Sequence, residues 1–319
     1  MHWLFTAARR LKELGVLGMN RRNAACILDH NPRARYPIVD DKLRMSDLCR
    51  RIGVPTPAVY ASVDSYGIMR RLPELLAGRD DFVVKPSRGS AGRGVLVVIG
   101  RTGNDYVRHN RERLRADALR QHISDTLSGM YSLGGQPDAA LIQQRVRLHP
   151  AFAAVSYKGI PDVRVILYRN EPAMAMLRLP TWESGGRANL HQGGIGTGID
   201  LDTGITSHAV QRDRAVTTHP DTGRPVVGML VPAWDQILRM ARRVAAAVGL
   251  GYVGVDIVVD ERQGPMLLEA NARPGLAIQI ANGQGLVPRL EAIDARLDAA
   301  ARERESIPAR PVEVLSEVA

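Results

Sequence analysis

Residues 253–271 read VGVDIVVDERQGPMLLEAN, two apolar runs joined by a short polar segment. The first run, 253–259, is rich in β-branched residues, and both runs have the length of buried strands. The connecting residues 260–264 have the composition of a hairpin turn. The sequence therefore predicts two antiparallel strands at this point of the chain.

Three oxygen-bearing side chains share one face of this predicted hairpin. If the turn is centred between residues 262 and 263, Asp256 lies opposite Glu269, and Asn271 shares the face of Glu269 because alternate strand residues point the same way. Two carboxylates within apolar strands are costly without a counter-charge. Mg²⁺ takes oxygen ligands and leaves positions for water and phosphates. We therefore predict a magnesium site here; the alternative is a solvent-facing side of the sheet.

A glycine-rich segment upstream joins two other apolar runs. Residues 82–99 read FVVKPSRGSAGRGVLVVI. This strand-to-strand context excludes a Walker loop and a dinucleotide fingerprint, which both need a helix directly after the glycines. Glycines let backbone N–H groups approach an anion, and the ammonium group of Lys85 is close by. We predict a phosphate-binding lid over residues 87–94; the alternative is an ordinary long hairpin turn.

The composition of the 319 residues is that of an ordinary globular protein, with 45% hydrophobic and 24% charged residues. These values exclude a disordered or disulfide-scaffold protein. The two cysteines, Cys26 and Cys49, fall in helix-like segments. No signal peptide and no apolar run of about 18 residues is present. We therefore expect a cytoplasmic protein.

The charge balance favours anionic partners. The chain has 43 lysines plus arginines against 33 acidic residues, a formal net charge of +10. A specific nucleic-acid binder is not expected, because only 4% of the residues are aromatic and no helix-turn-helix or zinc-finger spacing occurs. Only four residues are lysines, so a lysine beside a glycine-rich loop is informative.

The order of the predicted elements divides the chain into four parts. These are a helical leader (1–37), a lobe with the glycine-rich lid (38–140), a second lobe with the metal site (141–295), and a helix end with a flexible tail (296–319). Within the lobes we expect helices at 40–52, 111–130 and 232–248 and strands at 82–85, 95–99, 141–146, 163–168, 173–178, 252–260 and 265–271. The first leader helix has a basic face beside Trp3, Leu4 and Phe5. We expect it to pack on the lobes; docking on a membrane or a partner protein is the alternative.

The combination of motifs resembles the ATP-grasp superfamily. The resemblance rests on Lys85 with its glycine hairpin, on GVD at 254–256 and on EANARPG at 269–275, and it extends over roughly residues 38–290. It implies an α+β fold of two lobes with the nucleotide cleft between them. Relatives carry a substantial α/β domain in front of the nucleotide lobe, and this chain has only the short helical leader.

Other segments resemble a subgroup of that superfamily. NLHQGG at 189–194 and LIQQ at 141–144 are similar to glutamate ligases of the RimK type. GMNRRN at 18–23 and YPIVDDK at 36–42 resemble alpha-L-glutamate ligase-like proteins. Gln192 departs from this pattern because it replaces an arginine common in the relatives, which leaves the use of glutamate open.

The resemblance implies an ATP- and Mg²⁺-dependent carboxylate–amine ligase. ATP phosphorylates a carboxylate, and an amine then attacks the acyl phosphate to form an amide. The substrates are expected to be small-molecule or peptide carboxylates and amines, with glutamate or another amino acid among them. The alternative is a nucleotide-binding regulatory or scaffold protein without turnover, against which the intact acidic ligand set argues.

The resemblance also assigns roles to individual residues. The nucleotide is assigned to Lys42, Lys85, Ser90, Gly92, Gly94 and a hinge segment containing Gln143, Gln144 and Val146, and one or two Mg²⁺ ions, with Mn²⁺ as a substitute, are assigned to Asp256, Glu269 and Asn271. Arg164 and Arg273 match basic positions near the transferred phosphoryl group and the substrate carboxylate. Asn189 and His191 lie on the loop that faces the acceptor. Gln144 stands where an acid often binds ribose, so nucleotide preference stays open.

Overall fold

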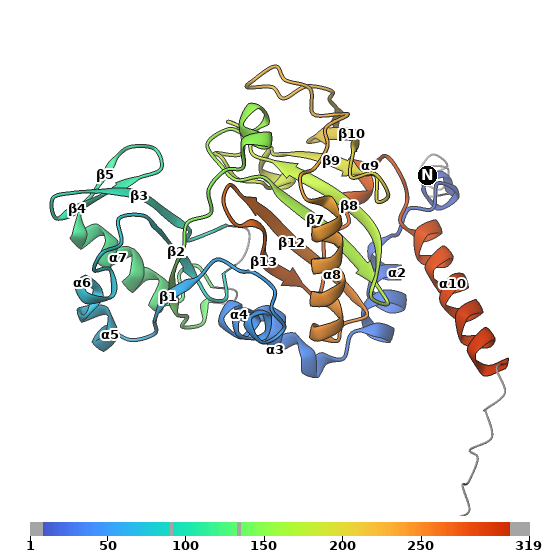
Figure 1. Cartoon of the computed structure of the whole chain (residues 1–319), viewed down its shortest axis with the longest axis horizontal. Helices are drawn as coiled ribbons and strands as arrows, with labels where there is room; N and C mark the ends of the chain where they lie inside the picture. The colour runs from blue at the N-terminus through green and yellow to red at the C-terminus, as the bar shows by residue number, and fades with distance from the viewer. Residues whose placement is uncertain (1–8, 90–91, 133–134, 307–319) are drawn as a thin grey trace, which may run out of the picture.

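Two antiparallel sheets with helices packed on them make up the computed structural model, which describes residues 9–89, 92–132 and 135–306 (Figure 1). The smaller lobe holds a six-stranded sheet and the larger lobe a seven-stranded sheet. A long helix extends from the larger lobe on the side away from the smaller one (Figure 1). This architecture confirms the predicted α+β fold of two lobes.

The six-stranded sheet is covered by α5 (Tyr66–Arg70), α6 (Leu72–Leu75) and α7 (Ala116–Leu127). Its strand order is β1-β6-β2-β3-β4-β5, with β1 Val59–Val63, β6 Ala140–Gln143, β2 Phe82–Pro86, β3 Leu96–Thr102, β4 Asp105–Arg108 and β5 Arg113–Leu114. The helix expected at 111–130 is shorter, because β5 occupies its first residues. The strand expected to open the second lobe, β6, pairs instead with β1 and β2 in this sheet.

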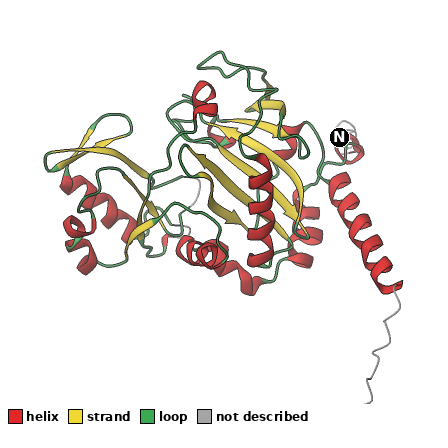
Figure 2. Ribbon diagram, in the orientation of Figure 1, coloured by secondary structure: helices red, strands yellow, loops and turns green. Residues whose placement is uncertain are grey.

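The seven-stranded sheet is sandwiched between α8 (Trp234–Val248) on one face and α9 (Ile278–Asn282) with α10 (Val287–Ser306) on the other (Figure 2). Its order is β11-β10-β9-β8-β7-β12-β13, with β11 Arg214–Ala215, β10 Thr206–Gln211, β9 Ile195–Ile199, β8 Glu171–Leu179, β7 Asp162–Tyr168, β12 Tyr252–Asp260 and β13 Gly264–Asn271. Helix α8 buries Ile237, Ala241, Val244 and Val248, at the three-to-four-residue spacing of an amphipathic helix.

The described part of the leader packs against the larger lobe. Residues 9–13 are helical, and α2 (Met19–Arg21) continues into a π-helical stretch, η1 (Arg22–Leu28). Leu17, Cys26 and Ile27 join the hydrophobic cluster that contains α9 and the first turns of α10. Trp3, Leu4 and Phe5 lie outside the described residues. None of the helices within the described ranges is long and apolar enough to span a bilayer.

Helix α4 (Lys42–Arg51) connects the lobes. It follows η2 (Arg33–Arg35) and α3 (Tyr36–Asp40). Its buried residues Met45 and Cys49 belong to the core of the larger lobe, although the sequence placed this helix in the first lobe. The division of the chain at residues 38 and 141 therefore stays a proposal. The helix at 42–51 packs against the seven-stranded sheet of the larger lobe.

Candidate active site

The β12–β13 hairpin places Asp256 opposite Glu269, as the sequence predicted, but through a different turn. The turn is centred on residue 262, because Asp260 pairs with Gly264. A β-bulge then adds one residue to β13 between the pairs Ile257–Leu267 and Asp256–Glu269. The extra residue, Leu268, moves Glu269 to the opposite face from Leu267. Glu269 thus faces the cleft while Leu267 is buried in the core.

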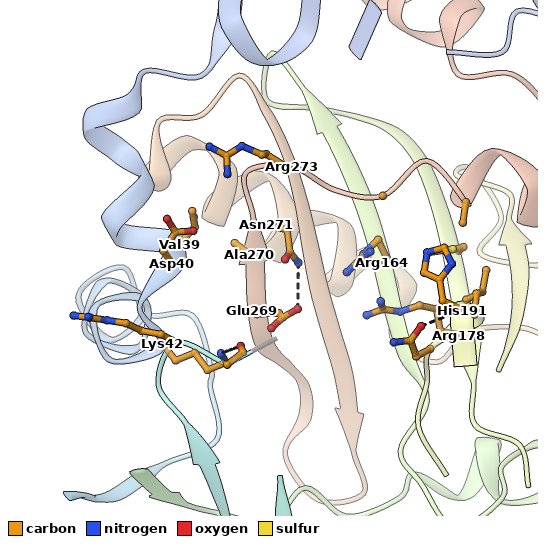
Figure 3. Close-up of a pocket in the computed structure, with 17 residues that line it drawn as sticks. Val39, Asp40, Lys42, Arg164, Arg178, His191, Glu269, Ala270, Asn271 and Arg273 are labelled. Atoms are coloured by element: carbon orange, nitrogen blue, oxygen red, sulfur yellow. Dashed lines mark hydrogen bonds between the residues drawn. The ribbon is translucent and has the colours of Figure 1, made fainter. Parts of the chain in front are cut away.

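A cavity of about 480 Å³ lies between the lobes in front of this hairpin (Figure 3). Seven residues predicted from the sequence line it, namely Lys42, Arg164, Asn189, His191, Glu269, Asn271 and Arg273. In Figure 3, Lys42 approaches Glu269 and Asn271 from one side, and Arg164 and Arg178 approach from the other. The cavity therefore gathers cationic side chains around a small set of oxygen donors.

Asp256 lies beneath the wall of this cavity, with only 1% of its side chain exposed. Arg164 donates to both of its oxygens, at 2.7 and 2.6 Å, and Arg178 Nη2 donates to Oδ2 at 2.7 Å. Burial alone would raise the pKa of Asp256, but the two guanidinium groups hold this pKa well below its usual range. Arg178 also donates to Asp162, whose pKa burial raises. These four residues form one buried ionic network.

The donor set offers a partial fit to a divalent cation. Asn271 Nδ2 donates to Glu269 Oε1 at 3.3 Å and approaches Asp256 Oδ2 at 3.5 Å, so the three side chains converge. Glu269 and Asn271 face the cavity, and carboxylate and amide oxygens suit Mg²⁺. Both oxygens of Asp256 already accept hydrogen bonds from arginine. Within the described ranges, no group of three histidine, cysteine or acidic residues could hold a metal ion.

A second, smaller cavity of about 20 Å³ adjoins the first and shares Lys42 with it. Its lining includes Lys85, Gln143 and Leu268. Burial, together with the nearby charge of Lys42, lowers the pKa of Lys85 to about 7. Lys42 itself donates to the carbonyl oxygens of Gly89 at 2.7 Å and Ser87 at 3.3 Å. The two lysines thus reach the region where the lid begins.

The glycine-rich segment joins β2 to β3, which pair antiparallel as predicted. Its first end is fixed because Asp138 accepts the backbone N–H of Arg88 at 2.9 Å. At its other end, Gly94 has φ +71° and lies under the ring of Tyr131, which leaves no room for a Cβ atom. Gly92 also has a positive φ, and a Cβ atom added there would meet only the side chain of Arg187, at 3.7 Å. Ser90 lies outside the described residues.

Two residues of the predicted hinge have visible packing roles. Gln144 Oε1 accepts the backbone N–H of Ala58 at 3.2 Å and so ties β1 to the end of β6. Val146 packs with Val258 and Met266. Neither Gln144 nor Val146 lines the two cavities, whereas Gln143 does. Their contact with a nucleotide stays a prediction.

The loop that carries Asn189 and His191 is held in place by its own hydrogen bonds. Asn189 Oδ1 accepts the backbone N–H of His191 at 3.0 Å, and the short helical turn η5 (Leu190–Gln192) ends at Gly193, where φ is +97°. The carbonyl of Gly193 accepts from Thr181 at 2.8 Å. This bracing presents Asn189 and His191 to the cavity.

Sequence reasoning missed four residues of the site, Arg88, Asp162, Arg178 and Tyr36. Arg178 could have been found, because it is the one charged residue in the apolar run 172–179. The same argument had singled out Asp256. Tyr36 stacks against Arg273, with 4.8 Å between the guanidinium carbon and the ring centroid, and no spacing in the sequence indicates that contact.

Two curated relatives match the chain by sequence. They are the cyanophycin synthetases of Synechocystis sp. (strain ATCC 27184 / PCC 6803 / Kazusa) and Geminocystis herdmanii (strain PCC 6308), which are 22% and 23% identical over 89% of this chain. The matches cover 33% of each relative, so the chain spans about a third of their length.

Solved structures with a similar fold are more distant. The ATP-grasp ligase PsnB complexed with precursor peptide PsnA2 and AMPPNP is 16% identical, with a TM-score of 0.45, over 84% of this chain and 60% of that one. D-cycloserine synthetase DcsG is 16% identical, with a TM-score of 0.46, over 83% and 73%. The RimK domain protein from Sphaerobacter thermophilus DSM 20745 is 15% identical, with a TM-score of 0.46, over 82% and 70%.

A family model also matches most of the chain. The model for sugar-transfer associated ATP-grasp proteins matches residues 21–295, which include both lobes and the second half of the leader. This match confirms the superfamily inferred from the lysine, the glycine hairpin and the acidic strands. The chain belongs to the sugar-transfer associated ATP-grasp family.

Proposed function

We propose that this protein is an ATP- and Mg²⁺-dependent carboxylate–amine ligase that forms an amide bond through an acyl phosphate. One observation carries the proposal: a single cavity between the lobes is lined by Lys42, Arg164 and Arg273 together with the oxygens of Glu269 and Asn271. Cations on several sides suit a triphosphate and a carboxylate, and the two oxygen donors suit a divalent ion. Membership of an ATP-grasp family supports the same reaction class.

The residues of the cavity have separate tasks in this proposal. Lys42 and Lys85 bind the phosphates of ATP, and Glu269 and Asn271 hold Mg²⁺, which neutralises charge on the phosphates when bound. Arg273 binds the substrate carboxylate, and Arg164 and Arg178 stabilise negative charge beside it. Asn189 and His191 orient the amine.

The chemistry has two balanced steps. A carboxylate oxygen attacks the γ-phosphorus, and the bond to the β-phosphate oxygen breaks, which releases ADP. The amine nitrogen then attacks the acyl carbon, phosphate leaves, and the nitrogen loses a proton to give the amide. Closure of the segment 87–94 excludes water, which would otherwise hydrolyse the acyl phosphate.

The finer assignment is a ligase of the alpha-L-glutamate ligase-like, RimK-like type that adds glutamate or another amino acid. Support comes from the motifs at 189–194 and 36–42 and from relatives named as cyanophycin synthetase, D-cycloserine synthetase and a peptide-bound ligase. Gln192 leaves the choice of amino acid open. The family description adds sugar derivatives to the compounds worth testing.

The decisive experiment is a screen for ADP release. Amino acids, short acidic peptides, uronic acids and amino sugars are supplied in pairs with MgATP, and mass spectrometry identifies any product. Lys85→Met should abolish ADP release, while Lys12→Met, on the exposed leader helix, should leave it unchanged. Equal rates for both variants would remove the proposed phosphate contact.

A nucleotide-binding regulatory or scaffold protein is the second candidate, and one measurement separates the two. A ligase catalyses exchange of label between ADP and ATP that depends on an added acid, because the acyl phosphate forms reversibly. A scaffold binds AMPPNP but shows no exchange with any acid of the panel.

A further inference from the structure

We propose that the leader is a working part of the active site, because its residues Asn31 and Tyr36 hold Arg273 in position for an incoming anionic group. The proposal rests on the assigned ligase function for the identity of that group, a carboxylate or phosphoryl group. Its structural content, the bracing of Arg273 by the leader, stands independently of that function. Asn31 and Tyr36 are positioning residues, since both act through Arg273.

Arg273 differs from the other two arginines of the larger lobe that line the cavity. Arg164 and Arg178 are paired with the buried carboxylate of Asp256. Arg273 forms no ion pair within 4.0 Å among the described residues, although it lines the same cavity. Among these three arginines, Arg273 is therefore the one that an incoming anion can pair with at no cost to an ion pair seen in the described residues.

Tyr36 restrains the Arg273 guanidinium group through a cation–π contact. The guanidinium carbon lies 4.8 Å from the ring centroid of Tyr36, which comes from the first position of α3. A ring over the flat face of a guanidinium group leaves the N–H groups at its edge free. Those edge groups bind carboxylate or phosphate with two parallel hydrogen bonds. The stack thus prepares Arg273 for bidentate recognition.

The leader also holds the backbone on both sides of Arg273. Asn31, which is only 4% exposed, donates to the carbonyl of Ala272 at 3.0 Å and to that of Tyr252 at 2.7 Å. Arg22 Nη1 donates to the carbonyl of Pro274 at 3.1 Å. The carbonyls of the two residues next to Arg273 in the chain, Ala272 and Pro274, are therefore each bound by a side chain of the leader.

These contacts supply hydrogen bonds to a segment that lies outside the sheet. Strand β13 ends at Asn271, and Arg273 is on the irregular segment that follows. Residues beyond a strand end lack ladder hydrogen bonds, so their carbonyls need other donors to stay in place. Asn31 supplies these bonds with a fully satisfied amide, because its Oδ1 also accepts the N–H of Tyr252 at 2.8 Å. Asn31 thus ties the residue directly before Arg273 to Tyr252, the first residue of β12.

The first test replaces the stacking ring. Tyr36→Leu should raise the KM for the acid substrate about 10-fold with little change in the KM for ATP, and Tyr36→Phe should restore the wild-type value because it keeps the ring. Tyr60→Leu is the matched control, since it removes a similar stack, with Arg79 at 3.7 Å, in the other lobe. An unchanged acid KM in Tyr36→Leu, or an equal rise in Tyr60→Leu, would overturn the proposal.

The second test needs no turnover, so it separates failure of the bracing from failure of the ligase assignment. Hydrogen exchange followed by mass spectrometry should show about 10-fold faster exchange in peptides covering 272–276 of Asn31→Ala, while β7 and β8 stay protected. Asn282→Ala, which removes an amide bound to the carbonyl of Ala175 at 3.0 Å, is the control. Unchanged exchange at 272–276, or a global rise in both variants, would contradict a local brace.

Discussion

The two hairpins that flank the cleft differ in how firmly their connections are held. The β12–β13 hairpin has a tight turn, and every residue of β12 is buried. The β2–β3 hairpin has a longer connection over 87–95, which is fixed at its two ends but includes exposed residues between them. The comparison teaches that one wall of the cleft holds oxygen donors on buried or half-buried, paired strands, whereas the other carries the segment for which we propose a closing movement.

The fixed wall should be the more sensitive to a chemical change. Replacing Glu269 with glutamine keeps the shape but removes the charge, and turnover should fall more than about 100-fold, beyond the 10- to 100-fold typical of groups that only support a metal ligand. Mn²⁺ binding, followed by electron paramagnetic resonance, should weaken in parallel. Glu261→Gln in the exposed turn of the same hairpin is the control. If both variants bind Mn²⁺ equally well, Glu269 is not a ligand.

The proposed lid should be sensitive to backbone strain instead. Gly92 has φ +70°, and a Cβ atom added there would lie 3.7 Å from Cδ of Arg187. Valine at this position therefore meets backbone strain of about 1–2 kcal/mol but no close contact of its Cβ atom. Gly92→Val should lower turnover about 10-fold while its melting temperature changes no more than that of Gly103→Val. Gly103, in the β3–β4 turn, has φ +58° and no neighbour within 4 Å. Equal turnover of the two variants would show that residue 92 is not part of a closing lid.

The same contrast explains what the sequence could and could not reveal. Apolar runs of strand length on either side of a turn segment predicted both hairpins, and an assumed turn centre predicted the pairing of Asp256 with Glu269. It could not reveal the bulge at Leu268, because two adjacent leucines fit either a regular or a bulged strand. The correct pairing thus came from two errors that cancelled, a shifted turn centre and a missing bulge.

Contacts between elements distant in sequence were the larger gap. The arginines around Asp256 come from β7 and β8, and the order of strands in a sheet is not encoded in local periodicity. The packing of α4 on the larger lobe was missed for the same reason: an amphipathic helix shows that it has a partner but not which one. Motif resemblance recovered the site because it carries such long-range information.

The smallest expected effect is a proton linkage at Lys85, which lies on strand β2 in the smaller lobe. Its pKa of about 7 is depressed by burial and by Lys42, so between pH 7 and about 10 the unfolded chain binds more protons than the native one. Stability of the free protein should therefore gain a contribution as pH rises through that window. Bound phosphates have the opposite effect on the pKa of Lys85: they raise it, because their negative charge favours the ammonium form.

Nucleotide binding at pH 8 should consequently take up about 0.9 proton, since a group with a pKa of about 7 is then roughly 10% protonated when free and fully protonated beside phosphate. Titration calorimetry in two buffers of different ionisation enthalpy measures this uptake with MgAMPPNP. Lys85→Arg should bind with no uptake from this site, because arginine stays charged. Uptake of the same size in Lys85→Arg would assign the proton to another group. Protonation of Lys85 would then not contribute to the affinity of the wild type for the nucleotide. Absence of uptake in the wild type would mean that the protonation state of Lys85 does not change when the nucleotide binds, which would contradict the linkage.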